Sequence, residues 1–134
     1  MLMKEPQNNR ESRLSIRQRE FMDYVYELCS KYTVILFGSR GRGDFTEESD
    51  YDILVIGEGN VPMHQEEWID VYFVELSSLD KKIEEFHPFV IDSFYEGFPL
   101  CDTLKIYDKI KVKVLERVKG FRKDKIGWIK ESKK

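Results

Sequence analysis

Long apolar stretches are missing from this sequence. No run approaches the roughly 20 residues that are needed to cross a bilayer, and the first residues, MLMKEPQNNRESR, lack the apolar core of a secretory signal. These absences predict a cytoplasmic protein with no membrane partner. Internal repeats and low-complexity tracts are absent too, so the length suits one domain over residues 1–134.

Cysteine and histidine are scarce, with two of each. Cys29 and Cys101 are far apart in the sequence and have no metal-type spacing. We expect both to be reduced and to pack as small apolar residues. His64 and His87 are isolated, so surface or local capping roles are expected for them. The sequence therefore predicts no metal site built on Cys or His.

The segment from Val34 to Ile56, VILFGSRGRGDFTEESDYDILVI, is the most informative part of the chain. It opens with an apolar run of the kind expected for a strand buried on both faces. A Gly/Arg-rich turn begins at Gly38-Ser39, and ten residues later Asp50-Tyr51-Asp52 leads into a second apolar run. Two carboxylates therefore stand at the entrance to a strand.

These carboxylates suit a metal site. Side chains two apart on a strand share a face, with Cα atoms roughly 6.5–7 Å apart, so Asp50 and Asp52 reach toward one point. Asp70 lies in the next apolar run, where an aspartate is costly unless it is paired or binds a metal. Three carboxylates on adjacent strands could hold two ions about 3.5–4 Å apart for in-line phosphoryl displacement. The structural alternative is capping of strand ends.

The Gly-Ser turn suits a phosphate site. Gly38 has no Cβ and lets the backbone approach a ligand, and the residues after it can present amide groups to an anion. Ser39 adds a hydroxyl, and Arg40 or Arg42 can donate two hydrogen bonds to phosphate oxygens. For Arg40 the alternative is a surface salt bridge. Together the two halves predict a triphosphate cradle that faces a metal site.

Gly38-Ser39, the ten-residue spacer, Asp50-Tyr51-Asp52 and Asp70 resemble the signature of the nucleotidyltransferases of the DNA polymerase β superfamily. The small size and the string GSRGRGD…SDYDILV resemble the minimal nucleotidyltransferases (MNT) of prokaryotes, often encoded beside HEPN-domain proteins. The resemblance covers roughly residues 15–107. One departure is Gly41, where alanine is common. Because glycine costs about 1 kcal/mol relative to alanine in a helix, we expect a looser turn there.

The resemblance implies a polymerase β palm-like α/β fold and a set of roles. Gly38, Ser39 and Arg40 would bind the triphosphate of ATP or another NTP. Asp50 and Asp52 would ligate Mg²⁺, with two ions expected. Asp70 would ligate the catalytic metal and help to deprotonate the attacking hydroxyl. In the resembling pairs the nucleotidyltransferase is an antitoxin that adds AMP to a tyrosine of a HEPN toxin, so a HEPN-domain partner is expected.

Two other functions stay open. The first is a non-catalytic nucleotide-binding module that neutralises a partner by forming a complex with it. The second is a small-molecule transferase of the aminoglycoside type, although resembling enzymes carry an extra helical domain. The chain is too short for its own large acceptor domain, which favours an acceptor site completed by another subunit. A homo-oligomer is possible.

The predicted architecture is α/β, with a mixed sheet of three to five strands flanked by helices. Residues 1–12 are expected to be loosely attached. The third strand should pair antiparallel with the second, because their connection is short. The expected elements are a helix carrying Leu14, Phe21, Val25, Leu28 and Tyr32; strands 33–37, 51–56 and 68–74; a short helix 39–42; helices carrying Leu79, Ile83 and Phe86 and then 89–96; and an edge strand within 99–106.

Positive charge gathers in the tail. Residues 105–134 carry twelve Lys and Arg against four Asp and Glu, whereas the whole chain has a net charge of −3. Nucleic acid is a possible partner, but a solvated Lys-rich segment that balances the acidic half is favoured. Ile110, Val112 and Val114 alternate like a strand, while Ile110, Val114 and Val118 share a helical face. We expect a basic helical segment over 108–134, broken at Gly120.

Overall fold

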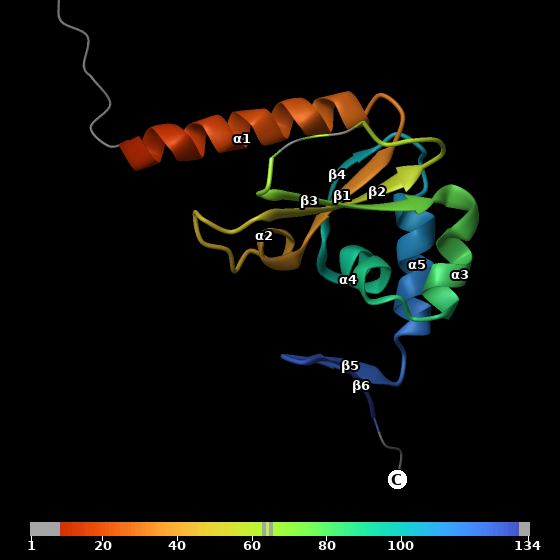
Figure 1. The fold of residues 1–134 in the computed structure, drawn as a ribbon. Coiled ribbons are helices and arrows are strands. Elements are labelled where there is room, and N and C mark those ends of the chain that lie inside the picture. The colour runs from red at the N-terminus through yellow and green to blue at the C-terminus, as the bar shows by residue number, and fades with distance from the viewer. Residues whose placement is uncertain (1–8, 63, 65, 132–134) are drawn as a thin grey trace, which may run out of the picture.

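The apolar run before Gly38 forms one of the two central strands of the main sheet. The computed structural model describes residues 9–62, 64 and 66–131. The elements, drawn in Figure 1, are α1 (Asn9–Leu28), β1 (Thr33–Phe37), α2 (Gly38–Arg42), β2 (Tyr51–Gly57), β3 (Ile69–Glu75), a 3-10 turn (Leu76–Ser78), α3 (Leu79–Glu84), α4 (Pro88–Glu96), β4 (Phe98–Asp102), α5 (Tyr107–Arg117), β5 (Phe121–Asp124) and β6 (Gly127–Lys130).

The main sheet has the strand order β3-β2-β1-β4. β1 pairs antiparallel with β2 and β4, and β2 pairs parallel with β3. The predicted antiparallel pairing of the second and third strands was therefore wrong. A seven-residue strand rises only about 23 Å, and the connection over 58–68 reaches up to about 36 Å when extended. It is long enough to return to the start of β2 without a helix.

The predicted mixed sheet flanked by helices is confirmed, with one helical layer on each face (Figure 1). α1 packs against one face through Phe21 and Leu28, which meet Val34 and Val55 of the sheet. α3, α4 and α5 cover the other face, where their apolar side chains pack on the alternate strand residues, such as Ile35. Because β1 and β2 lie between two layers, their apolar runs are buried on both sides.

The cysteines were predicted wrongly. Cys29, directly after α1, and Cys101, on β4, form a disulfide with Cα atoms 6.1 Å apart, although 72 positions separate them in the chain. β4 pairs with β1 and so runs beside the segment that links α1 to β1. In the same place the Thr103 hydroxyl donates a 2.6 Å hydrogen bond to the Cys29 carbonyl. The disulfide therefore ties α1 to the edge of the sheet.

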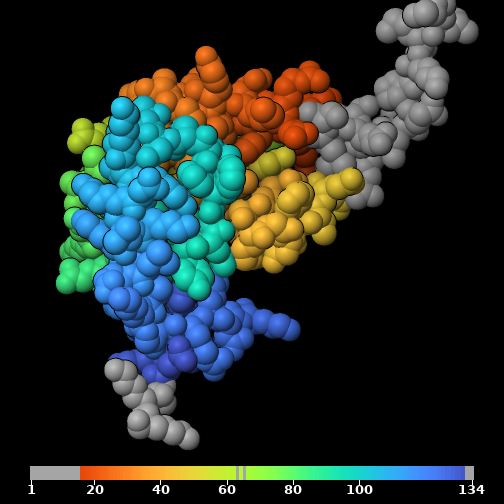
Figure 2. Space-filling model, turned by 180° about the vertical axis from the view of Figure 1, so that it is seen from behind, coloured from red at the N-terminus to blue at the C-terminus, as the bar shows by residue number. Residues whose placement is uncertain are grey.

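Both ends of the chain differ from expectation. Residues 9–12 form the start of α1, and residues 1–8 lie outside the described part. The helix predicted over 108–134 is wrong beyond Val118, because β5 and β6 form an antiparallel hairpin. Residues 132–134 lie outside the described part. The hairpin lies beyond the α3–α5 layer, at the opposite end of the molecule from α1 (Figures 1 and 2).

The hairpin is attached to the domain by aromatic side chains. The Trp128 ring meets Phe86 at 5.6 Å and Tyr95 at 4.7 Å between centroids, and Phe121 meets Phe86 at 4.7 Å. The Trp128 indole N–H also donates a 2.8 Å hydrogen bond to Asp92 of α4. These contacts pack the hairpin against α4 and the turn that precedes it.

Candidate active site

Two of the three predicted carboxylates meet at one end of the sheet. Asp52 is the register partner of Phe37 at the end of β1 and of Asp70 near the start of β3. Because side chains alternate along a strand, Asp52 lies on the same face as Leu54, the face covered by α3 to α5. Asp50 precedes β2 and is exposed.

The carboxylate pair has a clear electrostatic signature. Burial raises the pKa of Asp52 to about 6, together with a hydrogen bond to Asp70 and the negative charges of Asp70 and Asp50. The nearby Arg42 acts in the opposite direction and lowers this pKa. The negative charges of Asp50 and Asp70 act on Asp52 more strongly than the opposing charge of Arg42, so this end of the sheet attracts further positive charge.

Of the three predicted metal ligands, Asp52 and Asp70 lie together, and Asp50 does not complete a group of three with them. Among residues 9–62, 64 and 66–131, no three His, Cys, Asp or Glu side chains lie close enough together to hold a metal ion. Asp52 and Asp70 are adjacent, while Asp50 acts on Asp52 through its charge. Mg²⁺ takes one or two carboxylates and completes its shell with water and substrate phosphates. The Asp52–Asp70 pair meets that requirement.

Gly38 lies directly against the carboxylates. Its φ is +70°, and a Cβ placed on it would be 2.4 Å from Oδ2 of Asp52. Both the backbone conformation and the available space therefore require glycine here. Because Gly38 has no side chain, the backbone at the start of α2 lies directly beside the Asp52 carboxylate.

Ser39 lies in the first turn of α2 and is partly buried. Its carbonyl accepts the amides of Gly43 at 2.9 Å and Asp44 at 3.1 Å, which closes this short helix. The helix ends at Gly43 with φ +91°. These bonds hold Ser39 between β1 and the start of the 43–50 loop.

The looser turn expected at Gly41 was wrong. A Cβ on Gly41 would lie 2.6 Å from the Leu36 carbonyl oxygen and 3.4 Å from the Cα of Gly97. Gly97 is equally restricted, because its own Cβ would meet the same carbonyl at 2.8 Å. Two glycines thus allow α2 and the end of α4 to approach β1 closely. Alanine does not fit at Gly41 in this chain.

Arg40 and Arg42 point to different partners. Arg40 donates to three carbonyls of the following loop, and its guanidinium lies over the Tyr51 ring. Arg42 forms ion pairs with Asp44 at 3.2 Å and Glu96 at 3.3 Å, and its charge acts on Asp52. Arg42 is therefore the arginine of the turn whose charge acts on Asp52.

An ionic cluster behind Arg42 was not foreseen. Lys123 of β5 pairs with Glu96 and, at 3.1 Å, with Asp92, so Glu96 connects Arg42 to the C-terminal hairpin. Asp92 and Glu96 are four apart on α4 and thus share a helix face, which the sequence does indicate. Their partner could not be found from sequence because the hairpin was not predicted.

Both histidines are partly buried, and His87 is the N-cap residue of α4. His64 is partly buried and lies 3.4 Å from Glu66. His87, also partly buried, has its Nε2 2.6 Å from the Tyr72 hydroxyl, while its Nδ1 is buried without a hydrogen-bond partner. Burial is the main cause that lowers the pKa of His87. The hydrogen bond joins α4 to β3 two residues beyond Asp70.

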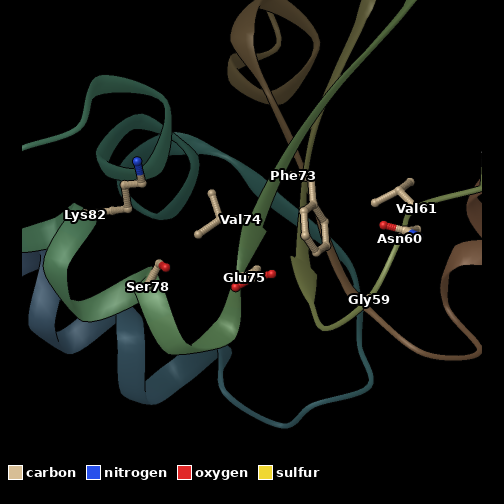
Figure 3. Close-up of a pocket in the computed structure, with 8 residues that line it drawn as sticks. All are labelled: Gly59, Asn60, Val61, Phe73, Val74, Glu75, Ser78 and Lys82. Atoms are coloured by element: carbon tan, nitrogen blue, oxygen red, sulfur yellow. The ribbon is translucent and has the colours of Figure 1, made fainter.

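A separate opening lies at the far ends of β2 and β3. It encloses about 450 Å³. Figure 3 shows its lining residues, which are Gly59, Asn60, Val61, Phe73, Val74, Glu75, Ser78 and Lys82. None of the predicted site residues lines it, because the carboxylates stand at the starts of these two parallel strands. The candidate active site is the carboxylate end of the sheet.

Comparison with known families agrees with this site. The family described as "Nucleotidyltransferase domain" matches residues 18–131, and the chain belongs to that family. The family inferred from the Gly-Ser and Asp-x-Asp pattern is thus confirmed, as is the nucleotidyltransferase fold. No helix within the described ranges is long and apolar enough to cross a membrane.

Individual relatives give further similarities. A protein of Methanocaldococcus jannaschii, named "Putative protein adenylyltransferase MJ0604", is 48% identical over 46 residues. This match covers 31% of the chain and 46% of the relative, so it spans less than half of that protein. A mutant of the toxin–antitoxin MntA–HpeT, solved as a crystal structure, is similar with a TM-score of 0.44 and 17% identity, over 75% of this chain and 86% of that one.

Proposed function

We propose that this protein is a Mg²⁺-dependent nucleotidyltransferase that transfers a nucleoside monophosphate, AMP from ATP, to a hydroxyl group. The observation that carries the proposal is the adjacent pair Asp52 and Asp70, with the Gly38 backbone against Asp52. Family membership supports the reaction class. The name of the archaeal relative supports adenylyl transfer over other nucleotidyl transfers.

The proposed reaction joins the acceptor oxygen to the α-phosphorus and breaks the bond to pyrophosphate. Gly38 and Ser39 receive the triphosphate through the backbone of the turn, and Arg42 adds a positive charge. Asp70 accepts the proton of the acceptor hydroxyl. Two Mg²⁺ ions, held by Asp50, Asp52 and Asp70 together with phosphate oxygens, would lower the pKa of that hydroxyl and neutralise charge on the leaving group.

We further propose that the acceptor belongs to a HEPN-domain partner and that the protein acts in the cytoplasm as its antitoxin. The resemblance of the GSRGRGD…SDYDILV string to minimal nucleotidyltransferases supports this partner. The exposed positions of Asp50 and Asp70 leave the acceptor side of the site open to a second protein. A reaction that uses ATP supports a location inside the cell.

Incubation with α-labelled ATP, Mg²⁺ and a HEPN protein tests the proposal. We expect label on the partner, with losses of at least about 100-fold in Asp52→Asn and Asp70→Asn, because electrostatic stabilisation by such groups is a large part of catalysis. EDTA should abolish labelling.

Transfer that persists in both variants would reject the proposed site. A partner that is neutralised without receiving label would support a binding module instead. Labelling of an aminoglycoside, but of no protein, would point to a small-molecule transferase.

A further inference from the structure

Arg40 makes several contacts with the loop that follows it. Its Nε donates to the Ser49 carbonyl at 3.1 Å, and one terminal nitrogen donates to the carbonyls of Glu47 at 3.2 Å and Thr46 at 3.5 Å. The guanidinium also lies 4.7 Å from the centre of the Phe45 ring. A single side chain therefore gathers most of the 43–50 loop around itself.

Tyr51 forms the other side of this arrangement. The Arg40 guanidinium lies 4.0 Å from the centre of the Tyr51 ring, and Phe21 of α1 stacks on the same ring at 3.9 Å and 17°. Two groups cannot occupy one face of a ring at these distances, so Tyr51 lies between Arg40 and Phe21. The Tyr51 amide also donates to the Trp68 carbonyl at 2.9 Å. The start of β2 is thus held from both faces.

We propose that Arg40 is a positioning residue for Asp50 and not a phosphate ligand. Asp50 stands between Ser49, whose carbonyl Arg40 binds, and Tyr51, whose ring Arg40 covers. Both peptide neighbours of Asp50 are therefore fixed by one guanidinium. In Figure 2 this segment, in amber, stands out from the molecule between α1 and α4.

The geometry favours this role over phosphate binding. Nε and a terminal nitrogen of Arg40 are already directed at loop carbonyls, and moving them toward a phosphate would release the loop. Arg42 is the neighbouring arginine whose charge acts on Asp52. A planar guanidinium can bind several carbonyls and stack on a ring at once, which a lysine ammonium cannot do. This inference rests on the proposed function in one respect, which is that Asp50 is a Mg²⁺ ligand.

Hydrogen exchange tests the loop itself without any ligand. The amides of Thr46 and Ser49 bond within the loop, to the Ser49 hydroxyl and the Thr46 carbonyl. We expect both to exchange at least about tenfold faster in Arg40→Ala and Arg40→Lys, since hydrogen bonds to a charged donor are among the stronger ones. Unchanged exchange would overturn the inference.

Arg117→Ala is the matched control. Arg117 of α5 also donates twice to a carbonyl, that of Glu84, and lies over two rings, Phe86 and Phe121. It makes the same kinds of contact away from the carboxylates. We expect its loss to leave the exchange of the 43–50 loop unchanged, so a general loosening of the fold is distinguished from a local one.

Binding of the non-transferable analogue AMPCPP separates positioning from phosphate contact. We expect Arg40→Ala to raise the Mg²⁺ concentration for half-maximal binding at least about tenfold, with weak binding in EDTA unchanged. Arg40→Lys should not rescue it. In Asp50→Asn the further change Arg40→Ala should have no added effect, because both act on one ligand.

The outcomes separate the two proposals. Weaker AMPCPP binding in EDTA, rescue by lysine or additive losses with Asp50→Asn would make Arg40 a phosphate ligand and overturn the inference. If the wild-type protein binds no Mg²⁺ and AMPCPP at all, the proposed function fails. Hydrogen exchange then still decides whether Arg40 holds the loop.

Discussion

Gly38 shows how much one residue contributes to this site. Its positive φ and its contact with Asp52 are two separate reasons for glycine. We predict that Gly38→Ala lowers transferase activity at least about 100-fold while the protein stays folded, because a left-handed alanine costs only about 1–2 kcal/mol. The measurements are labelled transfer and urea unfolding.

Gly59→Ala is the control for this prediction. Gly59 has a similar φ of +86°, but a Cβ there would meet nothing within 4 Å. It should therefore carry the same backbone cost without displacing a carboxylate. Equal losses of activity in the two variants would mean that backbone strain, and not contact with Asp52, explains the effect.

Gly41 gives a second prediction at the scale of the residue. Alanine is favoured over glycine by about 1 kcal/mol in a helix, but here its Cβ would strike the Leu36 carbonyl. We predict that Gly41→Ala lowers the free energy of unfolding by about 1–3 kcal/mol, as overpacking does. Urea denaturation measures this. A more stable variant would show that α2 moves away from β1 at little cost.

At the scale of the elements, His87 connects α4 to β3. Because burial lowers its pKa below 6.5, the neutral form is favoured in the folded protein. The unfolded chain then binds more protons as the pH falls below about 6.5, so stability drops. We predict that the wild-type protein loses unfolding free energy relative to His87→Gln as the pH falls from 7 to 5.

Urea unfolding at a series of pH values checks this. Asp52, whose pKa is raised to about 6, also titrates in this range and acts in the opposite direction, so the comparison is between the two proteins at each pH. An identical pH dependence with and without His87 would show that this histidine does not contribute to the change of stability with pH. Tyr72→Phe is informative as well, because it leaves His87 Nε2 without its partner.

At the scale of the whole molecule, the disulfide joins the first helix to the edge strand. It closes a loop of 72 positions, for which the chain-entropy relation gives about 4 kcal/mol. We predict a loss of about that size when Cys29 and Cys101 are both replaced by alanine or when the protein is reduced. Thermal unfolding with and without reductant measures it.

Disulfides are rare in cytosolic proteins of mesophiles, so the bond also bears on where the protein works. Alkylation of free thiols in freshly lysed cells, followed by mass spectrometry, shows the state of both cysteines. Two alkylated cysteines would mean that the pair is reduced in the cell, and the predicted contribution to stability would then apply only outside it.

Local patterns were enough to predict most of the elements. The apolar runs gave β1, β2 and β3 within about a residue of their bounds, and the helical spacings gave α1, α3, α4 and α5, because each pattern reflects a neighbour on one face. The β5–β6 hairpin was missed because its strands are short and polar, so they alternate weakly.

The sequence by itself determined the family, because the Gly-Ser turn and the Asp-x-Asp spacing are local and chemically specific. Only the tertiary structure decided the parallel pairing of β2 with β3, the Cys29–Cys101 bond, the lack of space at Gly41 and the partners of Arg40. Each of these depends on segments that are distant in the chain or on the exact path of a loop. Local residue types and spacings do not show which distant segments will meet, because those contacts form only when the chain packs.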